Sequence, residues 1–216
     1  MDRWRLRPTT LDEAAGGTDR LRRAYDRAVE DRDRSEKQPW KLAERAAFLD
    51  RLRAEGRTRL VEIGAGTGQD SAFFAAGGIE VLATDLSPAS VRRCRAKGLT
   101  ASVMDLRRPD LPAGSFDAAY SVNCLLHVPN AELPAALAAV AALLRPSGLF
   151  FLGLYGSDVA DEGIAPWDRH DPPRFFSWRT DAQIQRFAAG SFEIVDFHPV
   201  TGPDLHFQSL TLRRPD

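Results

Sequence analysis

The sequence has only two cysteines, and it lacks the long apolar segments of membrane and secreted proteins. Its two cysteines, Cys94 and Cys124, do not have the spacing of a zinc motif, so we expect reduced thiols in a cytoplasmic protein and no metal site. No apolar run approaches the roughly 20 residues of a membrane-spanning helix. Residues 1–17 also lack the apolar core of a signal peptide. We therefore expect neither membrane insertion nor secretion.

An excess of charge of one sign is also missing. The 29 basic and 30 acidic residues give a net charge of −1, whereas a surface that binds nucleic acid usually carries a basic excess. The 216 residues, 44% of them apolar, suit one globular domain with a small appendage. We expect a small-molecule partner, no nucleic acid or membrane partner, and a monomer or homodimer.

The chain has two parts with different patterns. Residues 1–56 are highly charged and contain two stretches with helical spacing of apolar residues, which predict a helical segment. In residues 57–216, strand-like runs at 59–63, 79–85, 99–105, 115–123 and 149–156 alternate with helical patterns at 69–78, 87–98 and 130–148. This alternation is typical of a doubly wound α/β fold with a mostly parallel sheet and helices on both faces.

The end of the chain departs from this alternation. After an irregular segment and a helix near 181–188, strand-like runs at 191–200 and 205–214 are separated by about four residues. A connection that short joins antiparallel neighbours, so the sheet is predicted to finish with an antiparallel hairpin. The two N-terminal helices are predicted to fold over the strand ends as a lid.

Three glycines follow the first strand, in the stretch RLVEIGAGTGQDS. Glycines in a strand-to-helix turn let the backbone approach a ligand closely. Gly64, Gly66 and Gly68 do not fit the dinucleotide fingerprint G-x-G-x-x-G, because Gln69 stands where that pattern has its third glycine. No lysine follows as in the loop that binds nucleoside triphosphates. The loop is therefore poorly suited to a pyrophosphate.

Carboxylates follow two of the predicted strands, and a third lies inside one. Asp85 ends the second strand and can accept both hydroxyls of a ribose, and Asp105 ends the third and can accept from an adenine amine. Alternatively, both residues only cap the turns that follow. Glu62 lies in a strand expected to be buried, where a carboxylate needs a partner such as the loop amides or a cationic ligand group.

Several stretches together resemble the class I S-adenosylmethionine-dependent methyltransferases. The motifs are VEIGAGTG, VLATDLS, SVMDL, FDAAYSVNCLLHV and LLRPSGLFFLG, in the order and spacing of that family. Ser147 departs from the pattern, because the family has glycine there. The resemblance covers about residues 59–155 by motif and implies a seven-stranded sheet with the ligand at the carboxyl ends of its strands.

The resemblance also assigns residues to the methyl donor. Asp85 would bind the ribose, Asp105 and Leu106 the adenine, and Asn123 would lie near the methionine moiety. The full set of implied donor-binding positions is Glu62, Gly64, Ala65, Gly66, Gly68, Asp85, Leu86, Asp105, Leu106, Asn123 and Cys124.

His127 is the candidate catalytic base. Methyl transfer from a sulfonium mainly requires that the reactants be aligned and water excluded, but some acceptors must also lose a proton. His127 follows the fourth strand closely, and imidazole titrates near neutral pH. Alternatively, it is a loop histidine that packs or binds backbone.

The acceptor pocket is predicted from aromatic and basic residues outside the motifs. A long irregular segment in a compact domain is usually functional or disordered, and the one after residue 154 is rich in aromatic residues. Alternatively, these side chains only fix the helices and the loop to the domain. The candidate residues are Tyr25 and Trp40 from the N-terminal helices, and Tyr155, Trp167, Arg174 and Phe175 from the later segment.

Three functions are left open at this point. The resemblance favours methyl transfer from S-adenosylmethionine to an O, N or S atom of a small molecule. The alternatives are an NAD-dependent oxidoreductase and a protein that binds S-adenosylmethionine without catalysis.

Overall fold

The computed structural model describes residues 5–9 and 17–216. The prediction that no signal peptide is present concerns residues 1–17. Most of these residues, 1–4 and 10–16, lie outside the described residues. In the described part of the chain, no helix combines the length and the apolarity needed to cross a membrane.

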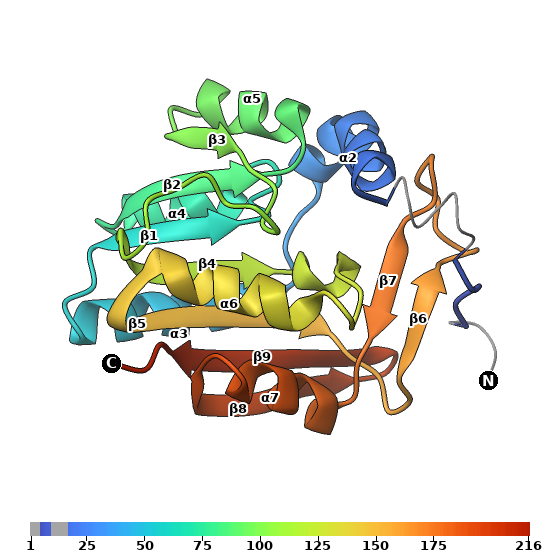
Figure 1. The fold of residues 1–216 in the computed structure, drawn as a ribbon. Helices are drawn as coiled ribbons and strands as arrows, with labels where there is room; N and C mark the ends of the chain where they lie inside the picture. The colour runs from blue at the N-terminus through green and yellow to red at the C-terminus, as the bar shows by residue number, and fades with distance from the viewer. Residues whose placement is uncertain (1–4, 10–16) are drawn as a thin grey trace.

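A seven-stranded sheet forms the centre of the fold, in the order β3-β2-β1-β4-β5-β9-β8 (Figure 1). Its strands are β1 (Arg59–Ile63), β2 (Glu80–Asp85), β3 (Ala101–Val103), β4 (Phe116–Val122), β5 (Leu144–Tyr155), β8 (Glu193–Gly202) and β9 (Leu205–Arg213). The first five are parallel, and β9 pairs antiparallel with both β5 and β8. The predicted α/β class, seven-stranded sheet and antiparallel C-terminal hairpin are confirmed.

Helices cover both faces of the sheet because its parallel strands are apolar on both sides. On one face, α3 (Pro39–Ala54) and α4 (Gln69–Ala76) pack Phe48, Leu52 and Phe74 against Tyr120 and Phe151. On the other face lie α6 (Leu133–Leu143) and α7 (Asp181–Ala189), and the largest core cluster joins both to the sheet. The rigid sheet therefore fixes the positions of the strand ends and the turns that follow them.

The two N-terminal helices occupy different places. Helix α3 contributes Phe48, Leu49 and Leu52 to the core. Helix α2 (Gly17–Arg34) lies beside α5 (Pro88–Ala96) and buries Ala24 alone among its residues (Figure 1). Because α3 is part of the core, we keep the prediction of a lid for α2 alone. The predicted domain boundary at residue 56 stays a prediction.

The segment predicted to be irregular contains a second, two-stranded sheet. Strands β6 (Asp161–Ile164) and β7 (Phe175–Trp178) pair antiparallel, and Arg7 forms a further bridge with Ile164. Figure 1 shows this sheet beyond the carboxyl ends of the central strands, facing α2. Each strand has four residues, too few for alternation to stand out in a sequence.

A second difference from the expectation concerns the start of β5. The helix predicted over 130–148 ends at Leu143, and Leu144 already pairs with Phe116 of β4. The residue before a proline disfavours helical backbone, and Arg145 precedes Pro146. The strand therefore begins five residues earlier than predicted.

Candidate active site

The glycine turn between β1 and α4 is held in a left-handed conformation. The φ angles of Gly64, Gly66 and Gly68 are 73°, 56° and 79°. A Cβ on Gly64 would lie 2.6 Å from the Cβ and Sγ of Cys124, and one on Gly68 would lie 2.6 Å from Leu99. Gly66 differs, because the nearest atom to its missing Cβ is Arg32 Nη2 at 4.0 Å. Two of the glycines thus serve close packing, and Gly66 faces open space.

Asp85 joins the end of β2 to this turn. Its Oδ2 accepts from the Gly66 amide at 2.8 Å, and its Oδ1 accepts from the Ser87 amide at 2.8 Å. Burial raises the pKa of Asp85. A carboxylate has about four lone-pair sites, so each oxygen retains capacity for a ligand hydroxyl. Asp85 therefore caps the following turn and also borders the open side of Gly66.

Asp105 and the two leucines lie at the same edge of the sheet. The Asp105 Oδ1 atom accepts from the Arg107 amide at 3.0 Å, which is the turn-capping role considered above. Within residues 5–9 and 17–216, no hydrogen bond is recorded on its Oδ2. Leu86 and Leu106 are half-buried, and Leu106 packs against the main core.

Glu62 contacts the first turn of α4. Its Oε2 accepts from the Ser71 hydroxyl in α4. Burial, with the nearby Asp70, raises the pKa of Glu62 to about 8. The Glu62 carboxyl is therefore mostly protonated at neutral pH and fixes the start of α4.

The end of β4 contributes an unusual asparagine. Asn123 has a φ of 56°, and its Oδ1 is buried without a hydrogen-bond partner among the described residues. The next residue, Cys124, packs against Gly64, and burial raises its pKa to about 12. A buried oxygen without a partner is costly, so Asn123 is a position where a ligand donor would be stabilising.

His127 lies at the end of the short 3₁₀ helix η1 (Leu125–His127) and is 5% exposed. Its Nδ1 is 2.6 Å from the Phe175 carbonyl oxygen, and its Nε2 is 2.6 Å from the Tyr25 hydroxyl. Burial and the neighbouring Arg174 guanidinium lower the pKa of His127 to about 3. Because a carbonyl can only accept, Nδ1 carries the proton of the neutral ring and Nε2 accepts from Tyr25.

Arg174 completes this group of side chains. Its Nη1 donates to the Tyr25 hydroxyl at 3.0 Å, while Nε and Nη2 donate to Asp168 at 2.8 and 3.0 Å. The two bonds to one carboxylate fix the plane of the guanidinium. Hydrogen bonding to His170 and Arg174 holds the pKa of Asp168 far below its usual range, although its burial opposes the shift.

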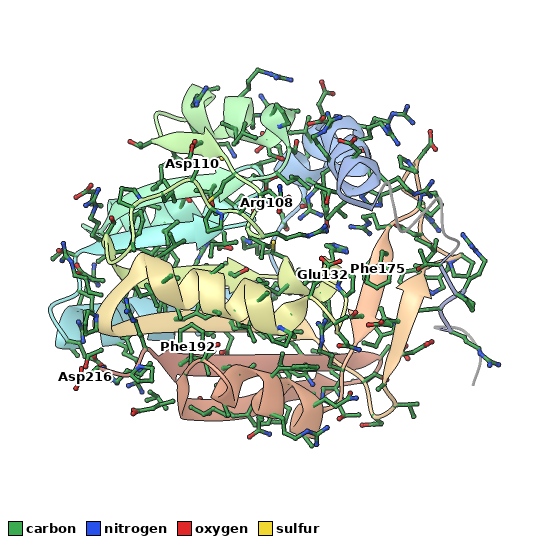
Figure 2. All side chains as sticks on the ribbon, viewed as in Figure 1. Arg108, Asp110, Glu132, Phe175, Phe192 and Asp216 are labelled. Atoms are coloured by element: carbon green, nitrogen blue, oxygen red, sulfur yellow. The ribbon has the colours of Figure 1, made fainter. Side chains whose placement is uncertain are left out.

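A cavity of about 310 Å³ opens beside this group. Figure 2 labels Glu132, just before α6, and Phe175, at the start of β7, whose side chains face the same region from two elements. The cavity is lined by Thr9, Gly17, Arg20, Leu21, Arg107, His127, Pro129, Glu132, Glu162, Ile164, Pro173, Arg174 and Phe175. Its walls are therefore both apolar and charged.

The structure separates the predicted acceptor residues into three groups. Tyr25, Arg174 and Phe175 surround His127. Trp40 and Tyr155 pack with Phe207, and Lys41 donates to the Tyr155 hydroxyl at 3.0 Å. Trp167 packs on Phe176 and Trp178. Of the predicted acceptor residues, Arg174 and Phe175 line the cavity, whereas Tyr25, Trp40, Tyr155 and Trp167 do not.

Sequence reasoning missed several residues that shape the site. Arg179 is fully buried, and its guanidinium donates to the carbonyls of Leu125 and Val128 at 3.2 and 2.5 Å, on either side of His127. The cavity-lining Arg107 and Glu132 form an ion pair at 3.2 Å. No motif marks these side chains, because their neighbours are distant in sequence. In the described ranges, no cluster of His, Cys, Asp and Glu is arranged to hold a metal ion.

Comparisons with known proteins agree with this geometry. Residues 60–148 match a family model described as a methyltransferase domain. A ubiquinone biosynthesis O-methyltransferase from Xanthomonas oryzae is 41% identical over 114 residues, which are 50% of this chain and 47% of that protein. The chain thus spans about half the length of the curated relatives that it matches.

Among solved structures, the fold is similar to two enzymes of different chemistry. One is the 1,6-didemethyltoxoflavin N1-methyltransferase of Burkholderia thailandensis, solved with its acceptor and S-adenosylhomocysteine. It has a TM-score of 0.74 and 25% identity, and the match covers 97% of this chain and 92% of that one. The other is the [4+2]-cyclase SpnF, with a TM-score of 0.68, 19% identity and 98% of each chain covered. The second likeness concerns the fold alone.

Proposed function

Because the chain belongs to the class I S-adenosylmethionine-dependent methyltransferases, we propose that it transfers a methyl group from S-adenosylmethionine to a small molecule. The observation that carries this proposal is the convergence of three groups at the carboxyl ends of β1, β2 and β4. They are the open side of Gly66, the Asp85 carboxylate and the Asn123 oxygen, which has no hydrogen-bond partner in the part of the chain that the structure describes.

These residues fit the donor. The Asn123 Oδ1 atom needs a donor group, which the amino group of the methionine moiety offers. The free lone pairs of Asp85 suit the ribose hydroxyls, and the space above Gly66 leaves room for the ligand. We assign the remaining implied positions, including Ala65, Leu86, Asp105 and Leu106, to the walls of the same site. When bound, the donor supplies a methyl group on a positively charged sulfur.

The geometry offers little to an NAD-dependent reaction. The Gln69 side chain, at the position of the missing third glycine, donates to the carbonyl oxygen of Ser35 at 3.0 Å and so tethers the link between α2 and α3. A dinucleotide loop has glycine at this position, which allows close helix–strand packing under a pyrophosphate. The oxidoreductase alternative is therefore not supported.

We place the acceptor in the 310 Å³ cavity. Leu21, Ile164 and Phe175 offer apolar walls for a ring, and Arg174 and Glu162 offer polar contacts to its substituents. The enzyme from Burkholderia thailandensis was solved with bound 1,6-didemethyltoxoflavin, and the curated relatives are named O-methyltransferases. We propose that the acceptor is a small ring compound with an ionisable O–H or N–H group, and that His127 receives the proton it loses.

Two measurements test this function. Titration calorimetry with S-adenosylhomocysteine is expected to show binding, with NADH as the control ligand that does not bind. Incubation of a metabolite extract with methyl-labelled S-adenosylmethionine is then expected to yield a labelled small molecule, which mass spectrometry identifies. Binding without any labelled product would favour the non-catalytic alternative, and binding of NADH alone would reject the proposal.

A further inference from the structure

Tyr25 lies between the proposed donor site and the proposed acceptor cavity. On one side, its hydroxyl contacts His127 and Arg174, which line the acceptor cavity, and Leu21 of the cavity wall is one helical turn away. On the other side, the Arg32 guanidinium lies 5.0 Å from the Tyr25 ring and extends to within 4.0 Å of the missing Cβ of Gly66. Tyr25 itself does not line the cavity, but it lies between two residues that do, His127 and Arg174, and the Arg32 side chain that reaches toward the donor loop.

The hydrogen bonds of the Tyr25 hydroxyl have a fixed direction. Arg174 can only donate, so the tyrosine oxygen accepts from it at 3.0 Å. The bare Nε2 of His127 can only accept, so the tyrosine proton points to it at 2.6 Å. One lone pair of the oxygen remains for a proton-bearing acceptor group.

We propose that the proton-bearing group of the acceptor extends from the cavity to Tyr25, and that Tyr25, rather than His127, takes its proton and passes its own proton to His127. This inference rests on the proposed methyl transfer. The lone pair of the acceptor atom forms the bond to the methyl carbon as the carbon–sulfur bond breaks and its electron pair stays on sulfur. The acceptor's proton moves to the Tyr25 oxygen, and the Tyr25 proton moves to Nε2 of His127.

The charges around His127 explain why the relay has to be coupled to transfer. Burial and, after it, Arg174 and Arg32 disfavour a positive imidazole, whereas Asp168 favours one. The imidazole is therefore neutral before the reaction. Methyl transfer removes the positive charge from sulfur, and the proton that reaches His127 adds a positive charge there. The net charge of the site therefore does not change. No additional charge is buried by the relay.

The carbonyl of Phe175 and the guanidinium of Arg179 hold the imidazole in place for this role. Phe175 fixes Nδ1–H, which leaves Nε2 as the accepting atom, and Arg179 pins the η1 backbone. We assign Arg179 as a positioning residue, since its guanidinium donates to two backbone carbonyls of this segment and to Asn130.

The test compares Tyr25→Phe, His127→Gln and the double variant in the full chain. The readout is the rate of label transfer from S-adenosylmethionine to the extract fraction that the wild type methylates. We expect each single variant to lose roughly 100-fold in rate, the double variant to lose no more than either, and S-adenosylhomocysteine affinity to stay within about threefold. Arg34→Gln, an exposed change on the same helix, is the matched control and is expected to keep the wild-type rate.

Two further readouts separate a relay from a merely structural contact. The deficit of Tyr25→Phe is expected to shrink at a pH above the acceptor's own pKa, because an ionised acceptor needs no base. Nitrogen NMR of the four histidines is expected to show a neutral His127 ring with the proton on Nδ1, and an Nε2 signal that moves in Tyr25→Phe.

Several results would overturn the relay. They are a Tyr25→Phe rate above a third of the wild-type rate, multiplicative losses in the double variant, a pH-independent deficit, or a His127 proton on Nε2. Failure of S-adenosylhomocysteine binding in the wild type would instead reject the proposed function, so the two failures are distinguishable.

Discussion

The two halves of the site are built in different ways. On the donor side, backbone turns at the ends of adjacent strands bring the groups together, as when Asp85 accepts from Gly66, 19 residues away. On the acceptor side, side chains from distant elements meet, as when Tyr25 reaches His127, 102 residues away, and Arg174, 149 residues away. Groups at strand ends belong to motifs that are visible in the sequence. Side chains that meet from distant elements leave no such local pattern.

The largest expected effect is on the donor side, at the glycine turn. Gly64→Ala would force a Cβ to within 2.6 Å of Cys124 at a φ of 73°, so we expect a loss of about 3 kcal/mol in the free energy of unfolding. Gly66→Ala is the matched control, because its Cβ meets open space and costs only about 1 kcal/mol of backbone strain. Urea unfolding compares them. Equal losses would mean that the turn is not packed against Cys124.

A loss of similar size is expected in donor affinity when Asp85 is replaced. Asp85→Ala removes charge-assisted hydrogen bonds to the ribose, which is expected to weaken S-adenosylhomocysteine binding by about 2–3 kcal/mol. Asp110, an exposed acid that lies near β3, is the control position for the same substitution (Figure 2). Calorimetric titration measures both variants. An unchanged affinity in Asp85→Ala would remove Asp85 from the ribose site.

The two halves are also expected to respond to pH with opposite signs. Between pH 4.5 and 6.5, native Glu62, with its pKa raised to about 8, keeps a proton that the unfolded chain loses, so its contribution to stability falls as pH rises. Native His127, with its pKa lowered to about 3, lacks a proton that the unfolded chain binds, so its contribution rises with pH.

Stability differences from the wild type expose these two contributions. From pH 4.5 to 6.5, the wild type is expected to lose about 2 kcal/mol relative to Glu62→Gln and to gain about 2 kcal/mol relative to His127→Gln. Chemical denaturation at both pH values measures the differences. Differences of the same sign would show that one of the two groups is not buried in the form described.

The smallest effect is expected where α2 meets α5. Asp33 forms ion pairs with Arg93 at 3.0 Å and Lys97 at 2.5 Å, near the surface. Asp33→Asn is expected to cost about 0.5 kcal/mol and to speed proteolysis within α2 before that of the central sheet. Uniform protection of both regions would mean that α2 does not open separately.

The sequence therefore predicts the two halves unequally. The mostly parallel sheet with its antiparallel hairpin, the glycine turn and the positions of Asp85 and Asn123 follow from periodicity and from motifs whose residues are close in the chain. The β6–β7 sheet and the cavity could not be predicted in this way, because four-residue strands carry little periodicity and Arg107, Glu132 and Arg179 act through partners that only the fold brings near. Tyr25 and Arg174 were candidates by residue type, but their common partner could not be predicted.

The place of β9 in the sheet has a consequence for the synthesis of the chain. Among the described strands, β9 leaves the ribosome after all the others, yet it lies between β5 and β8. Until it emerges, the edge of β5 is unpaired and β8 has no neighbour through which to join the sheet. An incomplete chain therefore exposes an apolar strand edge, and protection against association during translation is required until the final residues of β9 are made.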